Sequence, residues 1–379
     1  MNPIIMHLFR QLTNHAPLLE QLQGVCRDLH PPEAKDILKP WLQEHQSLWS
    51  SAEAIQNEVS LDALDYRCLL GFIKRDLSHQ DLTGVDFSGL ALDGFDFSHS
   101  RLIRARLRRT SFTRADMTGV DLTGADADHA FFDEACLVEA VLINGQFLHT
   151  SWSFADMHHA DLSRADFTGA SLFQTNLLGV RAQATTARLV MGDRACLSGS
   201  DWSHSELIGA SFQNALLNEI QMQHARVDYA NFDGASLQKA NLFSLYGEHT
   251  SFKCANLENA NLEKSVLLYS LLEKANLRGA NLGGMSARGA LFDDATFSSE
   301  TVIEASSHDL IAAVLEASAT TFQQRMFAAV IRKATEYCWE EFTRELKKRP
   351  ELISWVEQTL TSYPSLERMV TYAKWILDH

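Results

Sequence analysis

The chain has 379 residues, of which 46% are apolar, and it carries a formal net charge of −15 at pH 7. This length supports a large buried core, and the negative charge excludes a protein that binds nucleic acid through bulk electrostatics. No apolar run reaches the roughly 18 residues of a membrane span, and the first residues lack the pattern of a secretory signal.

The cysteines are isolated and form no C-x-x-C pair, so neither a disulfide framework nor a metal site is expected. We predict no cofactor and no bound metal. The protein is expected in the cytoplasm, or exported by a dedicated secretion system without a cleavable signal peptide. The cysteines are Cys26, Cys68, Cys136, Cys196, Cys254 and Cys338.

Residues 1–74 predict an N-terminal helical region. Prolines punctuate this stretch, and two polar residues are plausible helix N-caps. The prolines are Pro17, Pro31, Pro32 and Pro40, and the caps are Asn14 and Ser60.

Residues 75–300 follow a five-residue repeat. From Leu77 to Phe297 there are 45 central positions, and 39 of them hold Leu, Phe, Met, Trp or Val. The residue two positions before each centre is usually small, as at Ala115 and Ala165. A period of five fits neither a helix nor a plain strand, so we predict a chain that turns a corner after each short extended piece. The central and the small residue then point inward, and the other three positions face solvent.

Phrases such as Ala115-Asp-Met-Thr-Gly119 and Ala275-Asn-Leu-Arg-Gly279 resemble the pentapeptide-repeat family. The resemblance implies a right-handed, four-sided β-helix, so the predicted class is a mainly β solenoid flanked by α-helical regions at both ends. About eleven coils at about 4.8 Å each would make a rod roughly 50 Å long. Aromatic residues recur every twentieth position, as at Phe112, Phe132 and Trp152, which independently favours four repeats per coil.

Six arginines form the most prominent patch of the repeat region, with no acidic residue between them in the sequence. They indicate either a solvated surface or a partner-binding site for an acidic group. They are Arg101, Arg104, Arg106, Arg108, Arg109 and Arg114.

The repeat weakens at three consecutive centres, Ala182, Ala187 and Gly192. Residues 181–194 therefore form either a coil with an irregularity or a protruding loop that contacts a partner. In the second case Arg181, Arg188 and Arg194 would make the contact.

Two polar patterns recur at fixed positions. Asp76, Asp96, Asp116 and Asp156 are spaced by multiples of twenty residues, and such columns either mimic DNA phosphates or bond the backbone at each corner. Eight histidines stand two residues after a centre, which places them at solvent-facing corners. His129 and His149 would stack, but no third ligand completes a metal set.

Residues 301–379 predict a C-terminal helical region with segments at 308–318, 321–347, 351–361 and 365–377. An apolar stripe at helical spacing would face its core. This region is expected either to cap the solenoid or to dock a partner, including a second copy in a homodimer. The stripe comprises Phe327, Val330, Ile331, Ala334 and Cys338.

The chain contains no P-loop, dinucleotide-binding, zinc-protease or nucleophile-elbow motif, so we predict no catalytic residues and no enzyme activity. We expect a protein-binding scaffold with no direct nucleic-acid contact and no membrane span, acting as a bacterial secreted effector or as a secretion or regulatory adaptor. The family resemblance also implies an alternative, a DNA mimic that binds a type II topoisomerase (gyrase).

Overall fold

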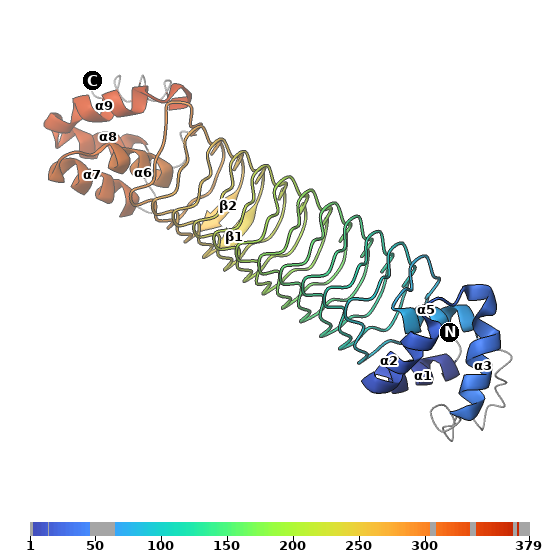
Figure 1. Cartoon of the computed structure of the whole chain (residues 1–379). Helices are drawn as coiled ribbons and strands as arrows, with labels where there is room; N and C mark the ends of the chain where they lie inside the picture. The colour runs from blue at the N-terminus through green and yellow to red at the C-terminus, as the bar shows by residue number, and fades with distance from the viewer. Residues whose placement is uncertain are drawn as a thin grey trace. The chain divides into compact units, whose positions relative to one another are not determined.

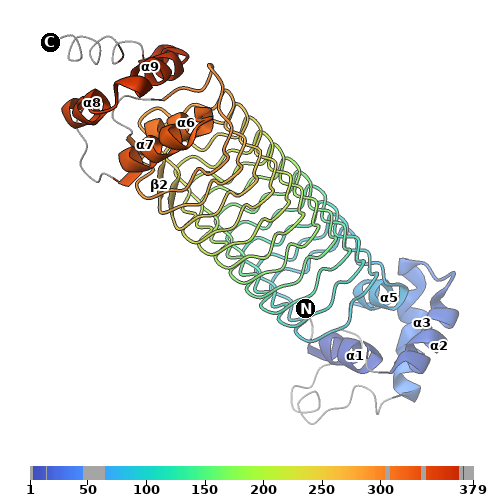
Figure 2. The same cartoon turned by 90° about the vertical axis from the view of Figure 1, so that its left-hand side faces the viewer.

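The chain forms two compact units, Met1–Asn176 and Leu177–His379. Each unit combines coils of the repeat region with helices, which precede the coils in the first unit and follow them in the second (Figures 1 and 2). The computed structural model describes residues 3–13, 15–45, 65–303, 308–333, 339–366 and 370.

Five-residue steps build the coils of both units. In each step a bridging residue is followed by a buried central residue and a tight turn. The bridges are parallel and join residues twenty positions apart, as in Asp96 with Asp116 in the first unit and Asp201 with Gln221 in the second. A coil therefore takes four steps, the period that the sequence predicts. The right-handed sense and the total of about eleven coils stay predictions.

The inside of each coil is filled as the sequence predicts. Every central residue from Leu77 to Phe292 is buried, and so is every residue two positions earlier from Val85 to Ala295. A buried Leu or Phe contributes about 1.5–3 kcal/mol, whereas ordering one residue's backbone costs about 1–2 kcal/mol. Because five residues share one large side chain, hydrogen bonds between coils must add to the stability. The N–H of Leu102, for example, donates to the carbonyl of Asp121 at 2.7 Å.

Each turn places the residue two after the centre in the left-handed conformation, as at Arg104 (φ 54°) and His129 (φ 58°). This conformation costs a non-glycine residue roughly 1–2 kcal/mol. An Asp or Asn before the centre helps to hold the turn, because its Oδ1 accepts the N–H two residues later. Thr123 donates to Asp121 in this way at 2.9 Å. The predicted corner bond is confirmed.

Helices of the first unit close the beginning of its coils. Phe9 stacks on Phe72 with ring centroids 3.7 Å apart, and Phe72 lies 5.3 Å from the ring of Phe95 in the coil. Such aromatic contacts cover the apolar end of a solenoid, as expected of a cap. The helices are α1 (Pro3–Thr13), α2 (Ala16–Cys26), η1 (Pro31–Glu33), α3 (Ala34–Glu44) and α5 (Tyr66–Lys74).

The helix boundaries of the first unit depart from the sequence prediction in one place. Pro40 lies inside α3 rather than at a helix end, so its predicted punctuating role is wrong. Asp65 caps α5 by accepting the N–H groups of Arg67 and Cys68. The predicted caps Asn14 and Ser60 lie outside the described residues.

The second unit ends in helices that Figures 1 and 2 both show beside its last coil. The segment 308–318 is helical as predicted. The segment 321–347 contains two helices, and residues 334–338 between them lie outside the described residues, with Ala334 and Cys338 among them. The elements are α6 (His308–Ser318), α7 (Phe322–Lys333), α8 (Trp339–Lys347), η4 (Pro350–Leu352), α9 (Ile353–Thr361) and η5 (Pro364–Leu366).

The predicted segments 351–361 and 365–377 and the apolar stripe are described in part. Residues 353–361 form α9, and residue 370 is helical, whereas residues 367–369 and 371–379 lie outside the described part. Phe327 and Ile331 of the stripe are buried. The division into regions 1–74, 75–300 and 301–379 stays a prediction.

Candidate functional site

The six predicted arginines lie around one coil rather than on one face of it. Residues five positions apart belong to successive steps, so Arg101 and Arg106 lie on neighbouring sides of the coil. Arg104, Arg109 and Arg114 occupy three successive left-handed corners. A cluster that is continuous in the sequence is therefore spread over several sides in space.

Acidic residues of the neighbouring coils neutralise four of these arginines. Arg101 pairs with Asp81 at 3.4 Å, Arg106 with Asp86 at 4.0 Å, Arg108 with Asp126 at 2.8 Å and Arg114 with Glu134 at 2.7 Å. The hydrogen bond and charge of Arg114 lower the pKa of the Glu134 carboxyl below its usual value. The sequence hides these pairs because the partners are eighteen or twenty residues apart. A role of the arginines in partner binding stays a prediction.

Residues 181–194 keep the five-residue step throughout, so the alternative of a protruding loop is wrong. Ala182 and Ala187 are buried. The side chain of Phe212 fills the space beside Gly192, where an added Cβ would lie 2.5 Å from the ring. Neighbouring side chains thus compensate for the small centres.

The three arginines of this stretch occupy ordinary positions of the coil. Arg181 bridges to Asp201, and Arg194 occupies a left-handed corner with φ 60°. Nε of Arg188 donates to Oε2 of Glu206 at 2.7 Å. Their contact with a partner stays a prediction, and they would make it from a regular coil.

The aspartate columns of the first unit follow the ladder of bridges. Asp76 bridges to Asp96 and Asp96 to Asp116. Each also accepts the backbone N–H two residues later, as Asp116 does from Thr118 at 3.0 Å. A second column, formed by Asp81, Asp121 and Asp161, is interrupted by Arg101, which pairs with Asp81. Residues 75–176 carry 15 acidic and 8 basic side chains, so the acidic surface is concentrated in this unit.

Corner histidines stack between coils as the sequence predicts. The rings of His129 and His149 lie 5.1 Å apart, and those of His79 and His99 lie 5.2 Å apart. Within the described part of the chain, no three His, Cys, Asp or Glu side chains converge on a possible metal position. The five described cysteines are free, and burial raises the pKa of Cys68 to about 12, so this thiol is unreactive.

An exposed column of aromatic side chains runs along one corner of the second unit. Tyr229, His249 and Tyr269 occupy left-handed corners of successive coils. Their ring centroids are 5.3 and 5.4 Å apart, and the interplanar angles are 19° and 18°. Tyr229 is 63% exposed and Tyr269 is 46% exposed. These three residues are called the aromatic ridge.

The aromatic ridge continues along the corner in both directions. Tyr269 lies over Gly289, where an added Cβ would be 2.5 Å from the ring, and Leu189 lies over Gly209 in the same way. Leu189 is 63% exposed. Because each of these side chains lies along the corner, apolar surface follows it from residue 189 to residue 289.

The outward face of β1 (Tyr246–Glu248) and β2 (Val266–Leu268) adjoins the aromatic ridge. The strands pair in parallel with Tyr246 opposite Val266 and Glu248 opposite Leu268. Tyr246 is 37% exposed, and Val266 and Leu268 are half-buried. Aromatic and aliphatic side chains of this kind, open to solvent on a rigid frame, are typical of protein-binding surfaces.

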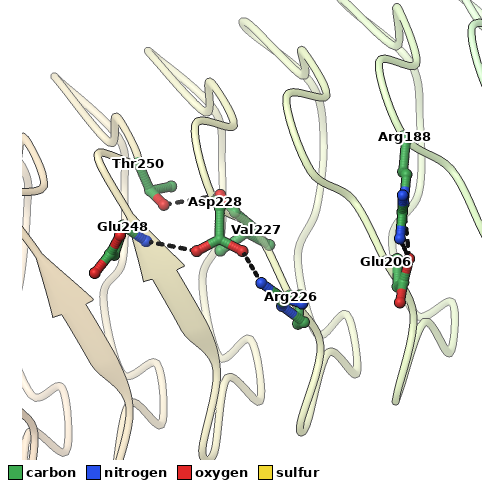
Figure 3. Close-up of polar contacts among 7 residues, drawn as sticks. All are labelled: Arg188, Glu206, Arg226, Val227, Asp228, Glu248 and Thr250. Carbon is green, nitrogen blue, oxygen red and sulfur yellow. Dashed lines mark hydrogen bonds and ion pairs between the residues drawn. The ribbon is translucent and has the colours of Figure 1, made fainter.

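Two ion pairs border this face (Figure 3). Arg226 donates to Oδ2 of Asp228 at 3.0 Å, and its guanidinium lies 5.7 Å from the ring centroid of Tyr246. Asp228 is only 6% exposed, and its Oδ1 accepts the N–H of Glu248 at 3.1 Å. The second pair joins Arg188 and Glu206. Both arginine charges are therefore balanced within the coil.

This surface was not predicted from the sequence, although the sequence contains a signal for it. Tyr246, Val266, Leu268 and Tyr269 stand at positions that the repeat assigns to solvent, where polar residues are the rule. An outward position filled by an apolar residue in successive coils indicates a binding surface, because such a residue adds nothing to the inner columns.

No helix among the described residues is long and apolar enough to cross a membrane. A family model described as pentapeptide repeats matches the chain in eight copies, at residues 100–137, 135–174 and 270–299. No curated protein matches the chain.

Several solved structures are similar to part of this chain. One is HetL from the cyanobacterium Nostoc sp. strain PCC 7120, a pentapeptide repeat protein involved in heterocyst differentiation regulation. It is 25% identical in sequence, and the match covers 58% of this chain and 88% of HetL, with a TM-score of 0.33. Rfr23 from the cyanobacterium Cyanothece 51142 is 20% identical over 34% of this chain and 91% of Rfr23, with a TM-score of 0.18. Full-length QnrB1, a plasmid-mediated fluoroquinolone resistance protein, is 14% identical over 58% of this chain and 93% of QnrB1, with a TM-score of 0.24.

Proposed function

Because the chain is a pentapeptide-repeat protein, we propose that it is a non-catalytic scaffold that binds a protein partner through the aromatic ridge and the adjoining face of β1 and β2. The observation that supports this function is the stack of Tyr229, His249 and Tyr269 on an outward corner. Three exposed rings in register contribute nothing to the inner columns of the coil.

The rigidity of the aromatic ridge suits binding. Stacking holds the ring of His249 between those of Tyr229 and Tyr269, and each tyrosine against His249, so little side-chain freedom is lost when a partner covers them. Tyrosine also brings a large apolar area together with a hydroxyl group, which explains its enrichment at binding hot spots. A partner would therefore find a surface that is already in its bound form.

The test compares quantitative affinity capture by the full chain with capture by a Tyr229→Ser/Tyr269→Ser variant. The control variant carries Asn259→Ser, which lies at another left-handed corner, two steps before Tyr269. We expect one protein to be captured in stoichiometric amount by the unmodified chain and by the control but not by the tyrosine variant. Equal capture by all three would refute the ridge as the binding site.

A second candidate function is a DNA mimic that acts on a type II topoisomerase. It is favoured by the aspartate columns of the first unit, in which Asp76, Asp96 and Asp116 bridge in successive coils at a spacing of about 4.8 Å. A gyrase supercoiling assay with added protein tests it. Inhibition or protection at micromolar protein would support the mimic, and no effect would remove it.

The cellular role proposed for the scaffold is that of a bacterial effector or of an adaptor in a secretion or regulatory system. The C-terminal helices are proposed to join two copies in a homodimer. Sedimentation of the full chain and of a chain ending at residue 300 tests the homodimer. A dimer that persists without the helices would contradict it.

A further inference from the structure

We propose that the partner of the aromatic ridge is a cationic amphipathic helix, one arginine or lysine of which pairs with Glu248. This inference rests on the proposed function and adds the chemistry of the partner. It starts from the charge that the face of β1 and β2 leaves uncompensated.

Glu248 forms no ion pair with any residue that the structure describes. It lies between Asp228 of the preceding coil, which is paired with Arg226, and the apolar Leu268 of the next coil. Its backbone N–H, not its side chain, points toward Asp228 in Figure 3. Arg226 is paired with Asp228 and Arg188 with Glu206. The strand pairing places Leu268 beside Glu248 in the next coil. The carboxylate of Glu248 therefore borders the apolar face with no ion-pair partner among the described residues.

This charge limits what can cover the face. An apolar partner would bury the Glu248 carboxylate without a counter-charge, which is strongly unfavourable. A cation from the partner removes that cost. Arginine is suited best, because its planar group can bind a carboxylate through two hydrogen bonds and stack on a neighbouring tyrosine.

Further acidic residues flank the other side of the aromatic ridge. Asp193 and Asp233 stand two coils apart, and each uses Oδ1 to hold a serine and a backbone N–H of the next coil. Among the described residues, neither aspartate forms an ion pair. Asp233, four residues after Tyr229, thus adds an unpaired negative charge on this flank, while Lys253 of the next coil pairs with Glu273. Charge complementarity with Asp233 and Glu248 favours basic residues beside the apolar stripe of a partner segment.

The spacing of the rings favours a helix as the occupant. Ring centroids recur at 5.3 and 5.4 Å along the aromatic ridge, and an α-helix advances about 5.4 Å per turn. A helix lying along the ridge would therefore bring one apolar side chain to each ring. The face of β1 and β2 would support its side.

The test uses two synthetic peptides of about five helical turns with the same leucine stripe. One carries lysine and arginine on its polar face and the other carries glutamate. Fluorescence anisotropy of each labelled peptide is measured with the full chain. We expect the basic peptide to bind, and Glu248→Gln to weaken it about tenfold. The matched control Glu258→Gln removes the same charge two steps around the coil and should change the affinity less than about twofold.

A charge reversal makes the test specific. The Glu248→Arg variant should no longer bind the basic peptide and should bind the acidic peptide instead. Three results would overturn the inference. The first is an equal loss of affinity for the basic peptide in Glu248→Gln and Glu258→Gln, and the second is failure of the basic peptide to bind. The third is a dimer of the chain that Glu248→Arg dissociates.

Failure of the inference can be separated from failure of the proposed function. If both peptides bind equally and Tyr229→Ser/Tyr269→Ser abolishes both, the surface binds apolar segments without regard to charge. This result would support the proposed scaffold function and contradict the proposal of a cationic partner. If the tyrosine variant binds both peptides normally, the ridge itself is not the site.

Discussion

The ring of Phe212 occupies the space that a side chain at Gly192 would need. A Cβ built on Gly192 would lie 2.5 Å from Cε1 of Phe212. Phe212 also stacks on Phe232 in the following coil, with ring centroids 5.7 Å apart. A missing central side chain is thus compensated from the next coil, and the repeat continues without a loop.

This contact predicts that Gly192→Ala destabilises the protein, although alanine is closer to the repeat pattern than glycine. The clash involves a ring held by its own stack, so overpacking should cost about 1–3 kcal/mol. Urea unfolding measures the loss. In a Phe212→Leu background the same change should cost clearly less, because the ring no longer fills the site. An equal cost in both backgrounds would show that Phe212 is not responsible.

Inward and outward positions of one step should differ sharply in stability. Leu257 is fully buried, so Leu257→Ala should lower the free energy of unfolding by roughly 2–5 kcal/mol. The adjacent Glu258 is half-buried and makes one long hydrogen bond with Gln238 at 3.3 Å. Glu258→Ala should therefore have almost no effect. Similar losses at the two positions would contradict the inside-outside assignment.

Acid should weaken the contact between α1 and the first coils. Burial acts to raise the pKa of Asp86, but hydrogen bonds from Ser88 and the charges of Arg10 and Arg106 outweigh it and lower the pKa. A lowered pKa stabilises the fold above the unfolded value of about 4, and this stabilisation is lost as pH falls through the folded value. Asp86→Asn should thus be less stable than the unmodified chain at neutral pH.

Denaturant midpoints at about pH 7 and about pH 2.5 check this prediction. The difference between the unmodified chain and Asp86→Asn should shrink toward zero in acid. A difference that stays constant over this range would mean that the charge of Asp86 does not stabilise the fold.

Replacing the six arginines of residues 101–114 with alanine separates the two candidate surfaces. Four of these side chains are balanced by acids of neighbouring coils, and exposed ion pairs contribute only about 0–1 kcal/mol each. We expect a melting temperature close to that of the unmodified chain and retained capture of the partner. Loss of capture with an unchanged melting temperature would assign the site to the arginines instead.

The coil was predictable because its cause is local. A large residue such as Leu257 recurs every fifth position, and each step repeats the same turn, so period and inward columns follow from the sequence. The ion pairs of Arg101 with Asp81 and of Arg114 with Glu134 could not be predicted from the sequence. Each joins residues twenty positions apart that only the coil brings together.

The proposed binding surface was predictable in part. Its signal, apolar residues at outward positions, is present at Tyr246 and Tyr269. What the sequence alone could not show is that the rings of Tyr229, His249 and Tyr269 stack in one column. That requires the corner geometry, which directs each side chain along the coil. For the same reason, the sequence alone could not show that the ring of Phe212 fills the space left by Gly192.

Site-specific photo-crosslinking tests the central claim most directly. A benzophenone amino acid replaces Tyr269 in one chain and Asn259 in another; both residues occupy left-handed corners and both lie over a glycine of the next coil. We predict one discrete adduct with a single partner protein from position 269 and none from position 259. The same adduct from both positions, or an adduct from position 259 alone, would contradict the aromatic ridge as the binding site.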